Sequence, residues 1–318
     1  MKNTLLLLVA FAAAGAARGY EIAVIPKGTT HEYWKSIHAG ALRAERELNA
    51  AGVPVKLIWK GPLREDDREQ QVQVVENFVG REVSGIVLAP LDSRALVAPV
   101  QEAVGAHIPV VIIDSALAEP VAASFIATDN REGGRIAARH LGRLLGGSGK
   151  GILLRYAAGS ASTTERERGF LEVMRSDFPR IVLLSTEQYA GATRDTARRV
   201  AENLLSRFGA EVNGVFASNE SAASGMLLAL RDAGLAGGKV KFVGFDSGQT
   251  LVAALKSGDV QALVIQDPFK MGYLGVKTLV AVLQGRKVAA AIDTGVGLAT
   301  PQNMDEPAVA ALLHPPID

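Results

Sequence analysis

The chain has 318 residues, 48% of them hydrophobic and 21% charged, a length that accommodates two ordinary domains. Its formal net charge is only +1, and its basic residues are interleaved with acids, as over 43–47, which argues against nucleic acid as a partner. There is no cysteine, which excludes disulfides, thiolate nucleophiles, cysteine metal sites and a lipid-anchor cysteine.

Residues 1–19 have the pattern of a secretory signal peptide. Lys2 precedes a short apolar core over 5–14, and small residues follow as candidate cleavage sites at Ala14-x-Ala16 and Ala17-x-Gly19. The apolar run is too short to span a bilayer, and the alternative is a buried first helix of the mature protein. We therefore expect export. Without a lipid-anchor cysteine after the leader, we expect a soluble protein in a Gram-negative periplasm.

Beyond the leader, short apolar runs alternate with longer amphipathic segments. Runs bounded by Gly or Pro predict buried strands, and apolar residues at spacings of three and four predict helices. The expected strands are 21–25, 55–59, 85–88, 110–113, 151–154, 181–184, 215–217, 240–245 and 263–265. The expected helices are 33–49, about 72–79, about 96–104, 132–145, 165–175, 194–208, 222–233, 250–256 and 270–283.

This alternation of strands and helices predicts an α/β fold, with parallel sheets covered by helices on both faces. The strands are too numerous for one sheet of ordinary size, which favours two doubly wound domains. No low-complexity linker divides the chain, so we expect several short hinge segments between the two domains.

Polar residues follow the expected strands at the positions where open α/β sheets bind ligands, beyond the carboxyl ends of the strands. These segments are 29–34, Pro90-Leu91-Asp92, Asp114-Ser115, Ser218-Asn219-Glu220, Asp246-Ser247 and Gln266-Asp267. The first of them contains an aromatic pair, Tyr33-Trp34. Carboxylates, amides and aromatic rings together suit a sugar, whose hydroxyls need polar partners and whose C–H face packs on a flat ring.

Two motifs resemble those of enzymes but lack required parts. In Gly146–Gly151, Lys150 is not followed by Ser or Thr, and the glycines precede the expected strand, whereas a phosphate loop follows one. A turn that ends the preceding helix is the better interpretation. Gly244–Gly248 has the shape of a nucleophile elbow around Asp246, but the one later histidine, His314, lies in a proline-flanked tail. We therefore expect neither enzymatic activity nor a cofactor.

Each candidate site residue also has an ordinary structural interpretation. The histidines form no metal-binding pair, and His31, which follows the first strand, either contacts the ligand or serves as a local cap. Asp114 and Asp246 either bind the ligand or cap the helices that follow. Arg166 on its own is typical of a solvated helix face. Trp34 fits the buried stripe of its helix, so Tyr33 and Trp34 need not both face the ligand.

A series of segments, in this order and spacing, resembles one known family. The segments are Tyr33-Trp34, Gly85–Pro90, Ile108–Asp114, Thr128-Asp129-Asn130 with Gly133-Gly134, Arg166–Phe170, Val215–Glu220 and Val243–Asp246. From residue 20 to about 300, the chain is similar to the ribose-binding-protein branch of periplasmic sugar-binding proteins. These are type I periplasmic binding proteins, and they share their fold with the effector domains of lactose-repressor-type regulators.

The resemblance implies two doubly wound lobes joined by a three-segment hinge. Crossings between the lobes are expected near residues 128–129, 266–267 and 293–294. The implied N-terminal lobe is 20–128 plus 267–294, and the implied C-terminal lobe is 129–266 plus 295–318.

The resemblance also implies a function. In this family a sugar ring lies between aromatics, polar groups of both lobes bind its hydroxyls, and the closed form is presented to an ABC transporter permease. A monomer without a cofactor or metal is expected. Carried over by motif position, the ligand contacts are His31, Tyr33, Trp34, Asp114, Arg166, Asn219, Asp246 and Gln266.

Several positions depart from the pattern of a ribose binder. An Asp-Arg pair is here Asp114-Ser115, an Asn-Asp pair is Asn219-Glu220, and His31 replaces a frequent Asn. No aromatic is evident at 190–191, although Tyr189 lies close by. We therefore expect a different sugar, a polyol or a sugar derivative.

Three other functions compete with transport. A periplasmic sensor subunit that delivers its ligand to a chemoreceptor or histidine kinase would have the same sequence features. A regulator's effector domain would need a DNA-binding helix-turn-helix where the leader lies. An enzyme on a similar scaffold lacks support, because no cysteine, histidine pair or phosphate loop is present.

Overall fold

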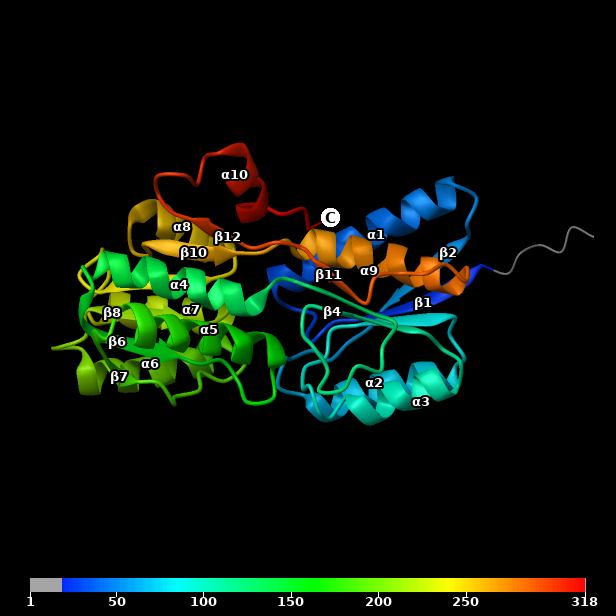
Figure 1. The fold of residues 1–318 in the computed structure, drawn as a ribbon, viewed down its shortest axis with the longest axis horizontal. Helices are drawn as coiled ribbons and strands as arrows, with labels where there is room; N and C mark the ends of the chain where they lie inside the picture. Colours follow the sequence, from blue (N-terminus) through cyan, green and yellow to red (C-terminus); the bar gives the residue numbers. More distant parts are fainter. Residues whose placement is uncertain (1–18, 318) are drawn as a thin grey trace, which may run out of the picture.

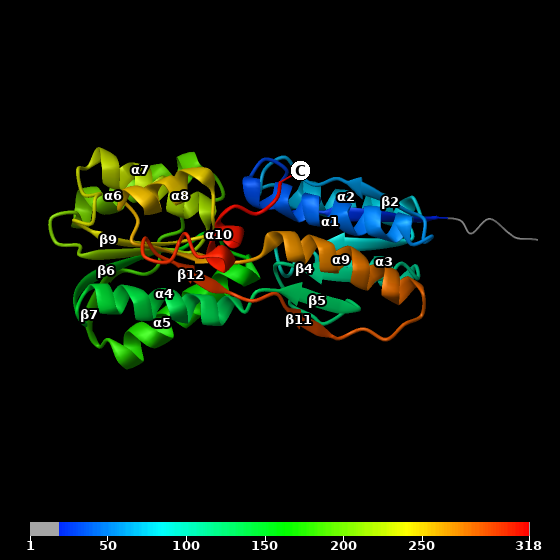
Figure 2. The same ribbon diagram turned by 90° about the horizontal axis from the view of Figure 1, so that it is seen from above.

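The computed structural model describes residues 19–317, so the predicted signal peptide, apart from Gly19, lies outside the described residues. Two lobes lie side by side along the long axis of the molecule (Figure 1). Each lobe contains a six-stranded sheet with helices on both faces (Figure 2). Among residues 19–317, no helix is both long and apolar enough to cross a bilayer. The predicted fold class, two α/β lobes with mainly parallel sheets, is confirmed.

The first lobe is built around the sheet β11-β5-β4-β3-β1-β2, in which every neighbouring pair is parallel. Its strands are β1 (Tyr20–Ile25), β2 (Val55–Trp59), β3 (Gly85–Leu88), β4 (Val110–Ile113), β5 (Ser124–Ala127) and β11 (Ala291–Asp293). Its helices are α1 (Glu32–Ala50), α2 (Arg68–Gly80), α3 (Val97–Gly105) and α9 (Pro268–Leu283). Helix α9 comes late in the chain but packs beside α1 (Figure 2).

The second lobe repeats this plan around the sheet β12-β10-β9-β8-β6-β7, in which β12 alone is antiparallel to its neighbour. Its strands are β6 (Ser148–Leu154), β7 (Arg180–Ser185), β8 (Gly214–Ala217), β9 (Lys241–Phe245), β10 (Ala262–Ile265) and β12 (Gly297–Ala299). Its helices are α4 (Asn130–Leu144), α5 (Ala161–Asp177), α6 (Arg194–Phe208), α7 (Glu220–Asp232), α8 (Gln249–Ser257) and α10 (Pro307–Leu313).

The chain passes between the two sheets three times: between β5 and α4, between β10 and α9, and between β11 and β12. The first and third crossings are hydrogen-bonded to each other. The Thr128 hydroxyl donates to the Gly295 carbonyl at 3.2 Å, and the Asp129 amide donates to Asp293 Oδ1 at 3.3 Å. Short neighbouring segments of this kind can act together as a hinge.

Each sheet is buried on both faces. Along β1, Ile22 and Val24 pack on the side of α1 and α9, while Ala23 and Ile25 pack on the side of α2 and α3. The second lobe likewise has one hydrophobic cluster on each face of its sheet. Burial on both faces explains why these strands are continuous apolar runs rather than alternating ones.

The glycine tract after α4 is partly a turn and partly a strand. Gly146 and Gly147 have φ of +61° and +76° and end the helix, as expected for a left-handed helix terminus. The strand begins earlier than the predicted residue 151, because β6 starts at Ser148, so Gly149 belongs to the strand and does not precede it.

Candidate ligand-binding site

A cavity lies between the two lobes, beyond the carboxyl ends of strands from both sheets. Fifteen residues line it, and they include every residue predicted to contact a ligand. From the first lobe these are His31, Tyr33, Trp34 and Asp114, and from the second Arg166, Asn219, Asp246 and Gln266. Seven further lining residues were not predicted as ligand contacts, although Glu220 lies in one of the strand-end segments: Lys27, Glu65, Tyr156, Ser160, Ser162, Thr163 and Glu220.

Asp114 is the centre of the first lobe's half of the cavity. It follows β4 directly, with φ of +62°, and β5 rather than a helix comes next, so the helix-cap interpretation is wrong. Its Oδ1 accepts a hydrogen bond from the Tyr33 hydroxyl at 2.7 Å, and its Oδ2 lies 2.7 Å from Lys27 Nζ. Lys27 is 4% exposed and lies just after β1, so the strand-end rule could have found it.

Glu65 is a second carboxylate on this side, carried by the segment between β2 and α2. Its Oε1 accepts from Trp34 Nε1 at 2.7 Å and lies 2.9 Å from His31 Nδ1, and its Oε2 accepts from the Tyr156 hydroxyl at 2.6 Å. Burial favours a raised pKa for Glu65, but these hydrogen bonds, led by that of His31, lower the pKa instead. Burial alone would lower the pKa of His31, yet the hydrogen bond and charge of Glu65 raise it.

Arg166 anchors the second lobe's half of the cavity from the first turns of α5. It is 2% exposed, so the alternative interpretation of a solvated helix residue is wrong. Its Nε donates to Asn130 Oδ1 at 2.8 Å, and its Nη1 donates to the Ser218 carbonyl at 3.1 Å. The guanidinium carbon lies 3.8 Å from the centre of the Phe245 ring, a cation–π contact. These contacts fix the guanidinium 3.8 Å from Asp246 Oδ2.

Asp246 follows β9 with φ of +73° and does not cap α8, whose N-cap is Gly248. Its Oδ1 accepts from Gln266 Nε2 at 2.6 Å, and its Oδ2 accepts from the Glu220 amide at 3.0 Å. Burial raises the pKa of Asp246, although the charge of Arg166 opposes this. Gln266 Oε1 is buried and has no hydrogen-bond partner within residues 19–317, so it can accept a hydrogen bond from a ligand hydroxyl.

Asn219 and Glu220 begin α7. Asn219 lines the cavity and is also the helix N-cap, with Oδ1 accepting from the Ala222 amide at 3.2 Å. The Glu220 carboxylate lies 2.5 Å from Arg194 Nη2. Burial raises the pKa of Glu220, against the charges of His31 and Arg194.

The aromatic residues of the cavity come from both lobes. Tyr33 and Trp34 both line it, with their ring centres 5.0 Å apart and their planes perpendicular. In the second lobe the lining aromatic is Tyr156, which follows β6 and is 3% exposed. Tyr189 does not line the cavity; it is 43% exposed, and Arg155 Nη1 donates to its hydroxyl at 3.2 Å.

The charges around the cavity are paired. Four carboxylates each lie beside a basic side chain, namely Asp114 with Lys27, Glu65 with His31, Asp246 with Arg166 and Glu220 with Arg194. Among residues 19–317, no group of three or more His, Cys, Asp or Glu side chains is placed to hold a metal ion. A charge-balanced cavity with many donors, acceptors and aromatic rings can bind a small, neutral, hydroxyl-rich molecule.

Comparisons with known proteins agree with this geometry. A family model described as a periplasmic binding protein domain matches residues 22–287. The ribose import binding protein RbsB of Haemophilus influenzae is 34% identical over 72% of this chain and 76% of its own length. A carbohydrate transporter solute-binding protein from Agrobacterium radiobacter, solved with D-arabinose, has a TM-score of 0.87 and 36% identity, covering 94% of this chain and all of that one. An ABC transporter solute-binding protein from Agrobacterium vitis, solved with D-fucose, also has a TM-score of 0.87 and 36% identity, over 92% of this chain and all of that one.

The fold and the interlobe cavity define a two-lobed binding protein of the type I periplasmic class. The chain belongs to the periplasmic binding protein domain family. The resemblance to its ribose-binding-protein branch, predicted from the sequence, is confirmed.

Proposed function

We propose that this protein is the solute-binding component of an ABC transporter and binds a small neutral sugar or polyol between its lobes. The observation that carries the proposal is that both lobes supply hydrogen-bonding groups and aromatic rings to one cavity at the strand ends. The transporter names of the relatives favour transport over the alternative of a sensor subunit.

The proposed ligand contacts are the eight residues predicted from the sequence, joined by Lys27. Asp114 and Asp246 accept hydrogen bonds from ligand hydroxyls, Arg166 and Lys27 donate to ligand oxygens, and Trp34 supplies an aromatic surface. All of them line the cavity, which supports these roles.

Binding proceeds by closure of the hinge. The lobes contact each other across the cavity, where the Ser115 hydroxyl accepts from the Ser162 amide at 3.1 Å and Lys27 Nζ donates to Ser162 Oγ at 3.3 Å. Nearby, Glu32 Oε2 accepts from the Gln249 amide at 3.0 Å. A ligand bound by both lobes favours this closed arrangement over an open one.

The proposed lobes are 20–128 with 267–294 and 129–266 with 295–318, in line with the strands of each sheet. Export by the leader over 1–19 places the protein in the periplasm. There it acts as a monomer without catalytic activity and delivers its ligand to a transporter permease.

A melting-temperature panel of pentoses, hexoses, polyols and sugar derivatives tests the proposal. A ligand that binds only the folded protein adds about 2.7 kcal/mol to its stability at one hundred times Kd, which produces an obvious shift. Small-angle scattering should show compaction with the best ligand. A flat panel, on folded protein free of co-purified ligand, would contradict the assignment to neutral sugars and polyols.

A further inference from the structure

Glu65 is a cavity residue that neither the sequence motifs nor the names of the relatives assign. It is 9% exposed although it lies in the charged run Arg64–Arg68. The backbone makes room for it, because a Cβ atom added at Gly28 would lie 2.9 Å from Glu65 Cγ. The local packing therefore holds this carboxylate inward, toward the cavity that it lines.

Three donors converge on the Glu65 carboxylate, and all three belong to residues that line the cavity. Trp34 and His31 come from the same lobe, whereas the hydroxyl of Tyr156 comes from the opposite lobe. The contact with Tyr156 joins the two lobes across the cavity, so it is made only when they are closed.

These contacts also decide what the aromatic residues can offer. Trp34 has a single side-chain donor, its Nε1–H, and this donor is given to Glu65. The hydroxyl proton of Tyr156 is likewise given to Glu65. The Trp34 indole therefore has no N–H left to donate to a ligand. The Tyr156 hydroxyl likewise has no proton left to donate, because Glu65 accepts it. Both rings suit the C–H face of a sugar better than a further hydroxyl.

We propose that Glu65 is a positioning residue for ligand binding: it fixes the Trp34 ring and, on closure, captures Tyr156 as the facing aromatic wall. This inference rests on the proposed function. Because the bond to Tyr156 exists only in the closed form, its loss speeds ligand dissociation and leaves association nearly unchanged.

A double-mutant cycle with Glu65→Gln and Tyr156→Phe tests the proposal, with D-ribose, D-arabinose and D-fucose as probes. Each single variant should raise the dissociation rate about tenfold, the effect expected for a hydrogen bond to a charged group. The double variant should be little worse than either single one, because Glu65→Gln removes the charge of the acceptor and Tyr156→Phe removes the donor of the same hydrogen bond. Glu69→Gln, an exposed acid at the start of α2, is the matched control and should not change the rate.

Additive effects of the two substitutions would overturn the proposal, since Glu65 and Tyr156 would then act separately on the ligand. A variant with a lower melting temperature but an unchanged dissociation rate would overturn it as well, because Glu65 would then only stabilise the fold. If the unmodified protein binds none of the neutral sugars, the proposed function itself fails, and that outcome is distinct from additivity.

Tryptophan fluorescence provides a second readout. The chain has two tryptophans, Trp34 and Trp59, and Trp59 stacks on His38 at 4.4 Å between ring centres. In a Trp59→Phe background, Tyr156→Phe should leave the ligand-free emission of Trp34 unchanged and reduce the change on adding sugar. Glu65→Gln should alter both. Unaltered emission in the Glu65 variant would contradict its contact with Trp34.

Discussion

In each lobe, two helices pack closely against each other at glycine residues, but only one of these helix pairs includes a cavity residue at the contact. In the first lobe, α1 and α9 approach closely at glycines: a Cβ added at Gly40 would lie 1.9 Å from the Phe269 carbonyl oxygen. In the second lobe, α4 and α5 do the same, and a Cβ added at Gly134 would lie 1.8 Å from the Arg166 carbonyl oxygen. Only the second contact is made to the backbone of a cavity residue.

The two halves of the cavity also differ in how their polar groups are held. Arg166 is bonded within its own lobe, to Asn130 and to the Ser218 carbonyl. In contrast, Glu65 in the first lobe has one of its three partners, Tyr156, in the opposite lobe. Arg166 is therefore held in place before closure, while Glu65 gains its last partner on closure. Such prior ordering lowers the entropy cost of binding.

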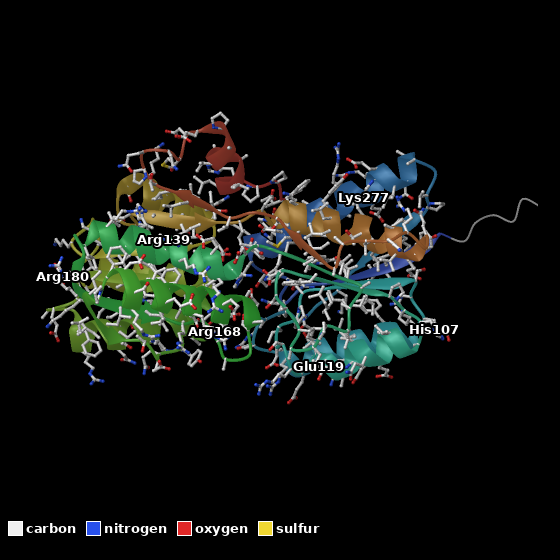
Figure 3. All side chains as sticks on the ribbon, viewed as in Figure 1. His107, Glu119, Arg139, Arg168, Arg180 and Lys277 are labelled. Carbon is white, nitrogen blue, oxygen red and sulfur yellow. The ribbon has the colours of Figure 1, made fainter. Side chains whose placement is uncertain are left out.

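The largest expected effect is that of Arg166→Ala. Removing the guanidinium leaves the buried Asp246 without its positive neighbour, which costs about 3–5 kcal/mol of folding stability for a buried pair. It also takes a charged donor away from the proposed ligand. Affinity measured by calorimetry should fall at least about a hundredfold. The control is Arg168→Ala on the outer surface of α5 (Figure 3), whose side chain is 62% exposed. Equal losses in the two variants would contradict the central position of Arg166.

Gly134→Ala and Gly40→Ala test the difference between the helix pairs. Each added methyl group must push two helices apart, a strain of about 1–3 kcal/mol, so both variants should melt at lower temperature. Gly134→Ala should also weaken sugar binding about tenfold, because it displaces the backbone of Arg166, whereas Gly40→Ala should affect binding less.

The control for these glycines is Gly80→Ala, at the end of α2, where an added Cβ would meet nothing within 4 Å. It should leave melting and binding nearly unchanged. If Gly40→Ala weakened binding as much as Gly134→Ala, the two helix pairs would be equivalent in function and the comparison between the lobes would fail.

Asp114→Asn tests the first lobe's half of the cavity, where Asp114 is held by partners of its own lobe. The Tyr33 hydroxyl keeps an acceptor, but Lys27 loses its buried counter-charge and a ligand hydroxyl loses a charged acceptor. A hydrogen bond to a charged group contributes about 1.5–3 kcal/mol, so affinity should fall about tenfold to a hundredfold. Asp195→Asn, at an exposed acid in the first turn of α6, is a matched control. An unchanged affinity for Asp114→Asn would remove Asp114 from the binding site.

The sequence predicted the buried strands well because their signals are local. For β3 and β4 the predicted bounds equal the observed ones, since each is an apolar run with Ser-Gly or Pro at its start. The strands β5, β11 and β12 were missed. β11 and β12 have three residues each and lie at the edges of their sheets, and β5 has only three apolar residues after Ser124. β5 and β11 pair with each other although more than 160 residues separate them in the chain, and no local sequence pattern encodes such a pairing.

The same limit applies to the candidate site. Asp114, Asp246 and Gln266 could be predicted because each directly follows a buried strand. Glu65 could not, because it lies in a charged loop whose local pattern is that of a solvent-exposed segment. Its contacts are made to residues far from it in the chain, including Tyr156 in the other lobe. Residues fixed by the strand-end rule are predictable, and those fixed by contact between lobes are not.

A pH-dependent effect concerns Glu167, the neighbour of Arg166 on α5. Its carboxylate accepts from the Tyr156 amide and from Ser218 Oγ, both at 3.1 Å, and burial raises its pKa from 4.5 to about 7. The folded protein therefore holds this proton more tightly than the unfolded chain. Stability is highest below pH 4.5 for this group and falls as the pH rises to about 7, by on the order of 3 kcal/mol.

Glu167→Gln should remove this dependence, so the unfolding free energy from urea titrations should change less between pH 5 and 7 than in the unmodified protein. His31→Gln acts at a residue of the first lobe that lines the cavity, and in a different pH range. The pKa of His31 is raised above 6.5 by Glu65 despite burial, so its contribution is complete below pH 6.5 and is lost above it. Glu167→Gln should thus flatten the profile below pH 7, and His31→Gln should flatten it above pH 6.5. If both variants flattened the stability profile over the same pH range, the titrations of Glu167 and His31 would be coupled, which would contradict the separate ranges expected here.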